Sequence, residues 1–214
     1  LLLVIWLYYR YTAKIVDVET AFLNGKLDED IYMECPSGLK DGSKDKVCKL
    51  NACIYGLVQA ARQYYKHFVE ILQKMGFIGG LVDPCLFSRV NELGTCYIAI
   101  YVDDNLIIGD EKAVDGAIKQ LQEHGLILKI ENSLSDYLSC EIVVNEKQQK
   151  AWLGQPHLIA NLERKFGDET QSLTRYVTPG TPGMYQLREK DESLMLPEEK
   201  RERYRSGVGM LLYL

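Results

Sequence analysis

Residues 96–110, CYIAIYVDDNLIIGD, place two adjacent acidic residues, Asp103 and Asp104, in the middle of a strongly apolar run. Short segments rich in Ile, Val and Tyr on both sides of a polar step are typical of two buried strands joined by a tight turn. Asp and Asn are favoured in such turns, so this stretch alone predicts a solvated hairpin turn. Burying two unpartnered carboxylates is costly, however, and the alternative is a pair of acids that faces a cation.

A third acid has similar surroundings. Asp17 lies in KIVDVETAF, between branched apolar residues, and is also compatible with an ordinary turn or strand edge. Two strand ends that each deliver a carboxylate nevertheless indicate a shared site for a hard cation, because Mg²⁺ prefers oxygen ligands and takes few carboxylates. Three such acids can serve two divalent ions, Mg²⁺ or Mn²⁺, held roughly 4 Å apart.

Composition limits the remaining possibilities. The chain has 214 residues, 47% of them hydrophobic and 26% charged, which predicts a globular core rather than a disordered or membrane chain. The net charge of −5 gives no general electrostatic attraction to nucleic acid. The apolar start, LLLVIWLYYR, is too short to span a bilayer and has no signal-peptide pattern, so no membrane partner is expected. It has no initiator Met and resembles a cut through a buried helix, which suggests a fragment.

Six cysteines without a C-x-x-C pair and three widely separated histidines argue against zinc. Cys53, Cys96 and Cys140 lie in apolar surroundings and are expected to be reduced core residues. Cys48 and Cys53 are expected to be unreactive.

Hydrophobic periodicity predicts an α+β fold with a largely antiparallel sheet packed on helices. Helices are expected at residues 1–10, 55–75, 111–124 and 156–166. Strands are expected at residues 15–18, 47–50, 83–90, 95–102, 105–110, 126–130, 137–144 and 150–154, with a short extended piece at 31–39. Residues 168–186 are the best linker candidate, and the charged residues 186–205 are expected to be solvated.

Five sequence blocks carry a specific resemblance. They are DVETAFLNG, KVCKLNACIYGLVQAARQYY, DPCLFSR, YIAIYVDDNLIIG and EEKRERYRSGVGMLLYL. In this order and spacing they resemble the reverse transcriptase of copia-type LTR retrotransposons over nearly the whole chain. The resemblance implies the palm of a right-hand polymerase in residues 1–155 and a thumb or connection segment in residues 156–214. It also implies a basic fingers region upstream and a ribonuclease H domain downstream, both outside this chain. The location of the basic residues in the fingers would explain the negative net charge of this chain.

The resemblance also implies roles for single residues. Asp17 would be the first metal-binding acid, with the Val18 carbonyl as a further ligand. Asp103 would bridge two ions, and Asp104 would be an accessory acid. The family's primer grip, which holds the primer terminus, corresponds to residues in DYLSCEI, namely Tyr137, Leu138, Ser139 and Cys140.

Four further residues would contact the nucleotide. Phe22 matches the steric gate, whose ring leaves no room for a 2′-hydroxyl; the alternative is an ordinary core Phe. Gln59 matches the glutamine that contacts the incoming nucleotide; the alternative is an exposed helix residue. Arg62 would contact phosphate or template, and Tyr101 would line the nucleotide site.

The chain departs from the family pattern at a few positions without losing a metal ligand. Ala61 stands where Pro is usual, and Gln63-Tyr64 stands where an Ala-Trp pair is common. Asn105 replaces an apolar residue, and Ser139 replaces a frequent Gly.

The implied function is RNA-directed DNA polymerisation, in which a primer 3′-hydroxyl attacks a deoxynucleoside triphosphate on an RNA or DNA template. The chain would act within a polyprotein that also holds fingers, integrase and ribonuclease H, in the cytoplasm and in virus-like particles. The alternative is a truncated, inactive remnant that keeps only the palm fold or a nucleic-acid-holding or assembly role. The isolated chain is expected to bind Mg²⁺ or Mn²⁺ weakly and to extend primers poorly.

Overall fold

The computed structural model describes most of the chain and divides it into two compact units. One unit comprises Leu1–Leu138 and Ile142–Trp152, and the other comprises Ser139–Glu141 and Leu153–Leu214. The described residues are 1–36, 46–145, 147, 150–170 and 195–213.

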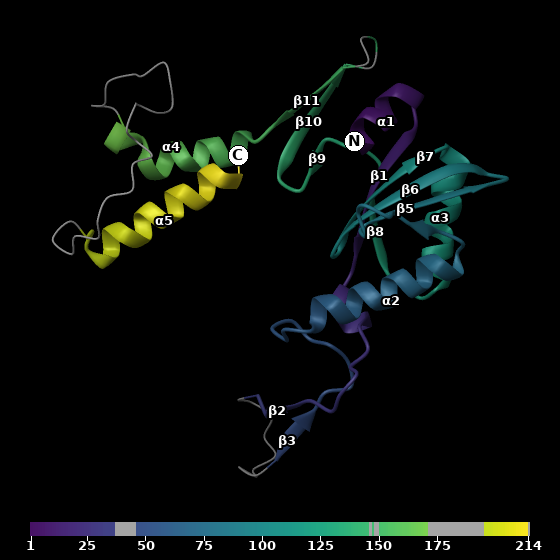
Figure 1. The fold of residues 1–214 in the computed structure, drawn as a ribbon, viewed down its shortest axis with the longest axis horizontal. Helices are drawn as coiled ribbons and strands as arrows, with labels where there is room; N and C mark the ends of the chain where they lie inside the picture. Colours follow the sequence, from purple (N-terminus) through teal and green to yellow (C-terminus); the bar gives the residue numbers. More distant parts are fainter. Residues whose placement is uncertain (37–45, 146, 148–149, 171–194, 214) are drawn as a thin grey trace. The chain divides into compact units, whose positions relative to one another are not determined.

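A six-stranded sheet forms the centre of the first unit (Figure 1). Its strand order is β4-β5-β6-β7-β1-β8, and each neighbouring pair is antiparallel. The mixed α/β architecture with a mostly antiparallel sheet is therefore confirmed. The strands are β1 (Thr12–Val18), β4 (Ile78–Gly79), β5 (Leu86–Asn91), β6 (Gly94–Tyr101), β7 (Asp104–Gly109) and β8 (Leu128–Glu131).

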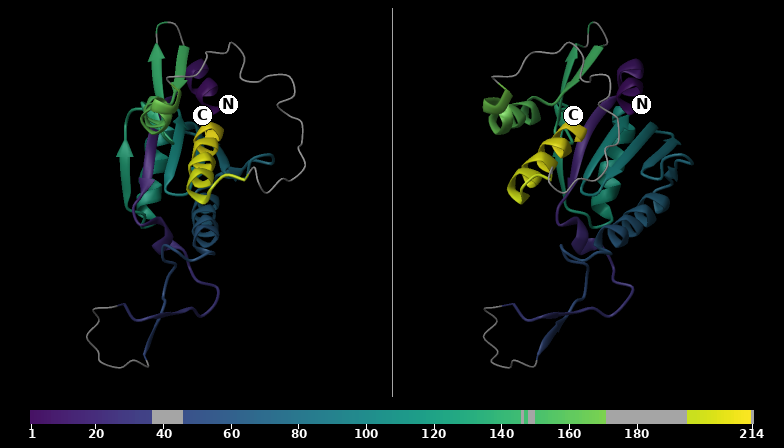
Figure 2. Two further views of the ribbon diagram at one scale, coloured as in Figure 1. Left: turned by 90° about the vertical axis from the view of Figure 1, so that its left-hand side faces the viewer. Right: turned by 60° about the vertical axis from the view of Figure 1, so that its left-hand side comes forward.

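Two amphipathic helices, α2 (Ala60–Lys74) and α3 (Glu111–Glu123), cover one face of this sheet (Figures 1 and 2). Their apolar residues recur every three or four positions and form one stripe each. Helix α2 begins five residues later than predicted, because Gly56 has a left-handed backbone (φ 101°). The core between the layers contains Val16, Val18, Ile98, Ile107, Tyr64, Phe68, Leu72, Val114, Ile118 and Leu121.

The opposite face of the sheet carries a smaller core around Ile15, Leu106 and Ile108. Helix α1 (Leu2–Tyr9) packs one side against it. The prediction of a buried helix is wrong, because no residue of α1 is buried and Tyr8 is 74% exposed. The helix is apolar all round, whereas only one side of it meets the sheet.

Two smaller sheets complete the β structure. Strands β2 (Tyr32–Glu34) and β3 (Val47–Lys49) pair antiparallel in a two-stranded sheet. Strands β9 (Asp136–Tyr137), β10 (Cys140–Asn145) and β11 (Lys150–Gly154) form a sheet in the order β11-β10-β9. The pairing of residues 150–154 with the preceding strand is confirmed. A single strand over 137–144 is wrong, because Leu138 and Ser139 both have left-handed backbone (φ 52° and 62°) and break it.

The second unit contains helices α4 (Pro156–Thr170) and α5 (Glu198–Tyr213), which contact each other. Lys165 Nζ donates to Ser206 Oγ at 2.6 Å, and the Arg203 guanidinium lies 5.0 Å from the Phe166 ring centre. The predicted linker lies outside the described residues except for residues 168–170, which end α4. Within the described part of the chain, no helix has both the length and the apolar character needed to cross a membrane.

Candidate functional site

The three candidate acids come together at the ends of the central strands. Asp17, near the end of β1, faces Asp104, the first residue of β7, in the antiparallel ladder. Asp103 lies in the turn between β6 and β7, and its carbonyl accepts a hydrogen bond from Val18 N at 3.0 Å. This bond fixes the turn to β1, so Asp17 and Asp103, 86 positions apart in sequence, lie at the same end of the paired strands β1 and β7.

The turn itself is strained. Tyr101 pairs with Asp104, which leaves Val102 and Asp103 as the two turn residues. Val102 has φ 55°, a left-handed conformation that is unusual for a β-branched residue and that such turns normally give to Gly. The sequence interpretation attributed the turn to the tolerance of Asp and Asn for this conformation, yet Val102 adopts it. The surroundings therefore hold the turn in place, as is common at functional sites.

Asn105 is part of what holds the turn. Its side chain is fully buried, and Nδ2 donates to Asp103 O at 2.9 Å and to Val16 O at 3.3 Å. The departure from an apolar residue at this position thus gives the acidic turn a second connection to β1. Burial, the Asp103 carboxylate and the Asp17 carboxylate raise the pKa of nearby Tyr64, and Asn105 opposes the shift. Tyr64 therefore stays protonated beside the acids.

The acids also influence one another. Burial raises the pKa of Asp104, and the carboxylates of Asp103, Asp17 and Glu131 raise it further, in that order, while Lys129 opposes them. Oxygen donors that repel one another are of the chemical type that binds hard divalent cations. Among the described residues, however, no three His, Cys, Asp or Glu side chains are grouped so that they could hold a metal ion as they stand.

The raised pKa of Asp104 predicts a pH-dependent effect on stability. A carboxyl whose pKa is raised by folding costs stability above its ordinary pKa, and the cost disappears as the pH falls through the raised value. We expect Asp104→Asn to have a higher unfolding midpoint than the parent at pH 7 in metal-free buffer, with the difference vanishing below about pH 4. Thermal unfolding from pH 3 to 8 measures this, with the exposed Glu92→Gln as the unchanged control. A lower midpoint for Asp104→Asn at pH 7 would contradict the prediction.

Phe22 lies five residues after Asp17, in the short 3₁₀ helix η1 (Ala21–Asn24). Its half-buried ring lies 4.7 Å from the ring centre of Tyr55 and 6.4 Å from that of Tyr64. Tyr55 is 60% exposed and was not identified from the sequence. The sequence offered one indication of its role: Tyr55 is an aromatic residue that directly precedes the turn residue Gly56, in the block that contains Gln59.

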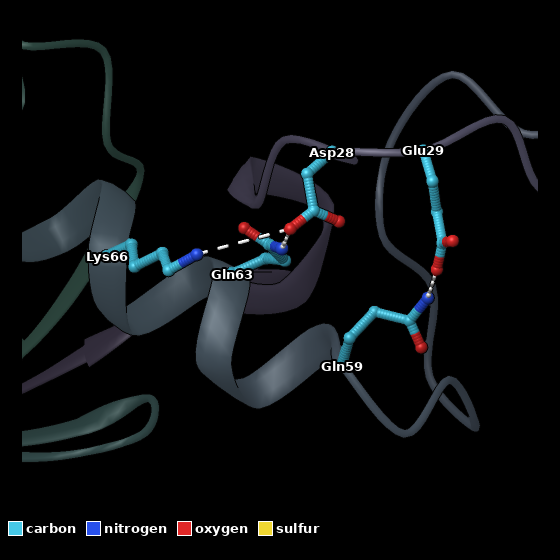
Figure 3. Close-up of polar contacts among 5 residues, drawn as sticks. All are labelled: Asp28, Glu29, Gln59, Gln63 and Lys66. Carbon is cyan, nitrogen blue, oxygen red and sulfur yellow. Dashed lines mark hydrogen bonds and ion pairs between the residues drawn. The ribbon is translucent and has the colours of Figure 1, made fainter.

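Gln59 directly precedes α2 and is bound to an acidic segment (Figure 3). Its Nε2 donates to Glu29 Oε1 at 3.1 Å, and the buried Gln63 donates from Nε2 to Asp28 Oδ2. Lys66 Nζ lies 4.0 Å from the same Asp28 oxygen. Sequence reasoning missed the two acids, which follow η1 by a few residues. Arg62, in the first turn of α2, is exposed.

The four residues predicted as a primer grip divide between the two units. Tyr137 and Leu138 belong to the first unit, whereas Ser139 and Cys140 belong to the second. Burial raises the pKa of Tyr137 to about 12, helped by the Asp104 carboxylate and then by Tyr101. Tyr137 is therefore close enough to Asp104 to interact with it electrostatically. Cys140 is half-buried and accepts a hydrogen bond from Gln155 Nε2 at 3.6 Å, so its predicted place in the core is wrong, whereas Cys53 and Cys96 are buried as predicted.

Comparison with known proteins gives a consistent result. Residues 1–177 match the protein family described as reverse transcriptase (RNA-dependent DNA polymerase). The chain is 33% identical over 207 residues to the retrovirus-related Pol polyprotein from transposon TNT 1-94 of Nicotiana tabacum. The matched region covers 92% of this chain and 15% of that polyprotein. It is 39% identical over 97 residues to the retrovirus-related Pol polyprotein from transposon RE2 of Arabidopsis thaliana. This matched region covers 45% of this chain and 7% of that polyprotein. The chain thus spans a small part of the length of these relatives.

Proposed function

Because this chain belongs to the reverse transcriptase family of copia-type transposon Pol polyproteins, we propose that it supplies the catalytic palm of an RNA-directed DNA polymerase. The six-stranded sheet with α2 and α3 would be the palm, extending over residues 1–155, and residues 156–214 would be a thumb or connection segment. The observation that carries the proposal is the pairing of Asp17 with Asp104 across β1 and β7, with Asp103 in the adjoining turn.

The acids would hold the ions that the reaction needs. Two divalent cations, Mg²⁺ or Mn²⁺, would supply activation of the primer 3′-hydroxyl and neutralise charge on the departing pyrophosphate. Asp17 and Asp103 would be the main ligands, Asp104 an accessory ligand, and the Val18 carbonyl a further oxygen donor. The donor types fit such ions, and the repulsion that raises the pKa of Asp104 is what a cation would relieve. The side chains must turn toward one another to bind, because they are not grouped as they stand.

The remaining residues would position the substrates. The hydrogen bonds from Val18 N and Asn105 Nδ2 to Asp103 O fix the backbone of the acidic turn. Gln59 would exchange Glu29 for the incoming deoxynucleoside triphosphate, with Arg62 and Tyr101 nearby in the nucleotide site. The hairpin that begins at Tyr137 would hold the primer end. Base pairing with an RNA or DNA template would select the nucleotide.

Phe22 gives a prediction about sugar selection. Its ring, supported by Tyr55, would exclude the 2′-hydroxyl of a ribonucleotide. We expect Phe22→Val to raise the ratio of kcat/KM for ribonucleotides to that for deoxynucleotides by roughly 10- to 100-fold, the range that steric discrimination of one small group provides. Single-nucleotide incorporation on one template, by a longer Pol segment that extends primers, measures the ratio, and Leu23→Ala, at an exposed neighbour, is the control. If Phe22→Val leaves the ratio of the two kcat/KM values unchanged, Phe22 is not the steric gate.

Primer extension tests the proposed function. Oligo(dT) on poly(rA), with Mg²⁺ or Mn²⁺ and dTTP, is compared for this chain and for a longer Pol segment that contains it. We expect extension by the longer segment and little by this chain alone, which spans 15% of the tobacco relative. A longer segment that binds the primer and template but never extends the primer would instead support a nucleic-acid-holding remnant.

A further inference from the structure

Two cysteines 13 positions apart in sequence meet on the β2–β3 hairpin. In the hairpin register Met33 pairs with Cys48 and Glu34 pairs with Val47. Cys35 directly follows the last residue of β2, and alternate residues of a strand point to the same face. Cys35 and Cys48 therefore lie diagonally on one face, and their Sγ atoms are 3.5 Å apart.

We propose that Cys35 and Cys48 form an oxidisable thiol pair, a modification site at which a disulfide closes across the end of the hairpin. A disulfide needs a sulfur–sulfur distance of about 2.05 Å, so the two Sγ atoms must approach by roughly 1.5 Å. Cys35 lies just beyond the last ladder pair of β2, and its Sγ also donates to Lys46 O at 3.4 Å. The backbone at this position can therefore make the adjustment that a diagonal pair requires.

Contact between the sulfur atoms separates this pair from the other cysteines. Cys35 is exposed, Cys48, Cys85 and Cys140 are half-buried, and Cys53 and Cys96 are fully buried. All six cysteines lie in the described ranges and are free thiols, and among them only Cys35 and Cys48 have their sulfur atoms in contact. Nothing in the sequence indicated a reactive Cys48, whereas the hairpin register places Cys35 beside it.

The oxidant we name is a small disulfide, glutathione disulfide. One cysteine thiolate attacks it, forming a mixed disulfide and releasing one glutathione thiolate, which takes up a proton. The second cysteine, after losing its proton, attacks the protein-side sulfur and releases the second glutathione. The two cysteines lose two electrons and two protons, and one glutathione disulfide becomes two glutathione thiols.

The reaction should depend on pH. The contact with Cys48 and then local desolvation raise the pKa of the Cys35 thiol. Because the thiolate is the nucleophile, oxidation should accelerate as the pH rises from 7 to 8, by up to about tenfold.

Mass spectrometry of the reduced full chain tests the proposal. The protein is incubated with glutathione buffers of graded ratio, quenched with acid, alkylated and digested. We expect a peptide linked through Cys35 and Cys48 to accumulate, whereas Cys35→Ser and Cys48→Ser, at accessible positions, stop at a mixed disulfide with glutathione. Cys85→Ser should behave as the parent. A parent chain that accumulates only the mixed disulfide, or only disulfide-linked dimers, would overturn the proposal.

Discussion

Asp103→Asn in a Pol segment that extends primers is expected to lower kcat by about 10³-fold or more, with little change in folding. The substitution keeps the size of the side chain and the backbone carbonyl that accepts from Val18 N, but removes the charge that would face both ions. Loss of one group that stabilises transition-state charge lowers kcat by about 10²- to 10³-fold, and loss of the proposed ligand of both ions should lie at or beyond the upper end.

A matched acid elsewhere in the chain controls for net charge. Asp115 on α3 pairs with Lys14 at 2.7 Å, and its side chain is 55% exposed. Asp115→Asn makes the same chemical change and should leave extension within about twofold, because an exposed pair contributes under about 1 kcal/mol to stability. Equal activity of Asp103→Asn and Asp115→Asn, at equal unfolding midpoints, would show that Asp103 is not a catalytic ligand.

Substitution of Arg89 is expected to lower the stability of the fold more than the other proposed substitutions. It is 7% exposed, and its Nη1 donates to Met75 O and to Gln120 Oε1, both at 2.7 Å. The guanidinium lies 4.4 Å from the Phe77 ring centre, so this one side chain connects the end of α2, the sheet and α3. We expect Arg89→Ala to lower the free energy of unfolding by about 3 kcal/mol, through a cavity and a carbonyl left unpaired.

A second substitution at the same position separates packing from charge. Arg89 Nε and Nη2 find no hydrogen-bond partner among the described residues, so part of the cost of burying this cation is not recovered. Arg89→Met fills most of the volume without that cost, and it should lose less than about 1.5 kcal/mol. Urea unfolding of the two variants measures the difference, and equal losses would show that the charge and its hydrogen bonds, rather than the packing, account for the stabilisation.

Local patterns in the sequence were sufficient to predict five of the six strands of the central sheet, but not β4 or the place of β1 between β7 and β8. Apolar runs separated by polar turns at residues 91–94 and 102–104 gave the β5-β6-β7 meander. The break at Leu138 and Ser139 could not be predicted, because neither residue is of a type that favours left-handed backbone. The late start of α2 has a different origin, because Gly56 is a residue that adopts positive φ readily and its conformation interrupts an otherwise helical pattern.

The acids of the site were visible in the sequence, but their supports were not. Asp17, Asp103 and Asp104 each stand out against apolar neighbours. Asn105, by contrast, was only a departure from a pattern until its amide was placed 3.3 Å from a carbonyl 89 positions away. The bond between Gln59 and Glu29 likewise joins residues 30 positions apart and depends on how the chain returns to α2. Contacts of this kind follow from the fold rather than from any local pattern.

The central claim is that Asp17, Asp103 and Asp104 form a divalent cation site, and Mn²⁺-induced broadening of amide signals in NMR spectra tests it most directly. The account predicts that low Mn²⁺ concentrations broaden the signals of residues 17, 18 and 103–105 first, that excess Mg²⁺ reverses this, and that Asp103→Asn abolishes it. Broadening that begins instead at the acidic residues 28–30, or that persists unchanged in Asp103→Asn, would contradict the account.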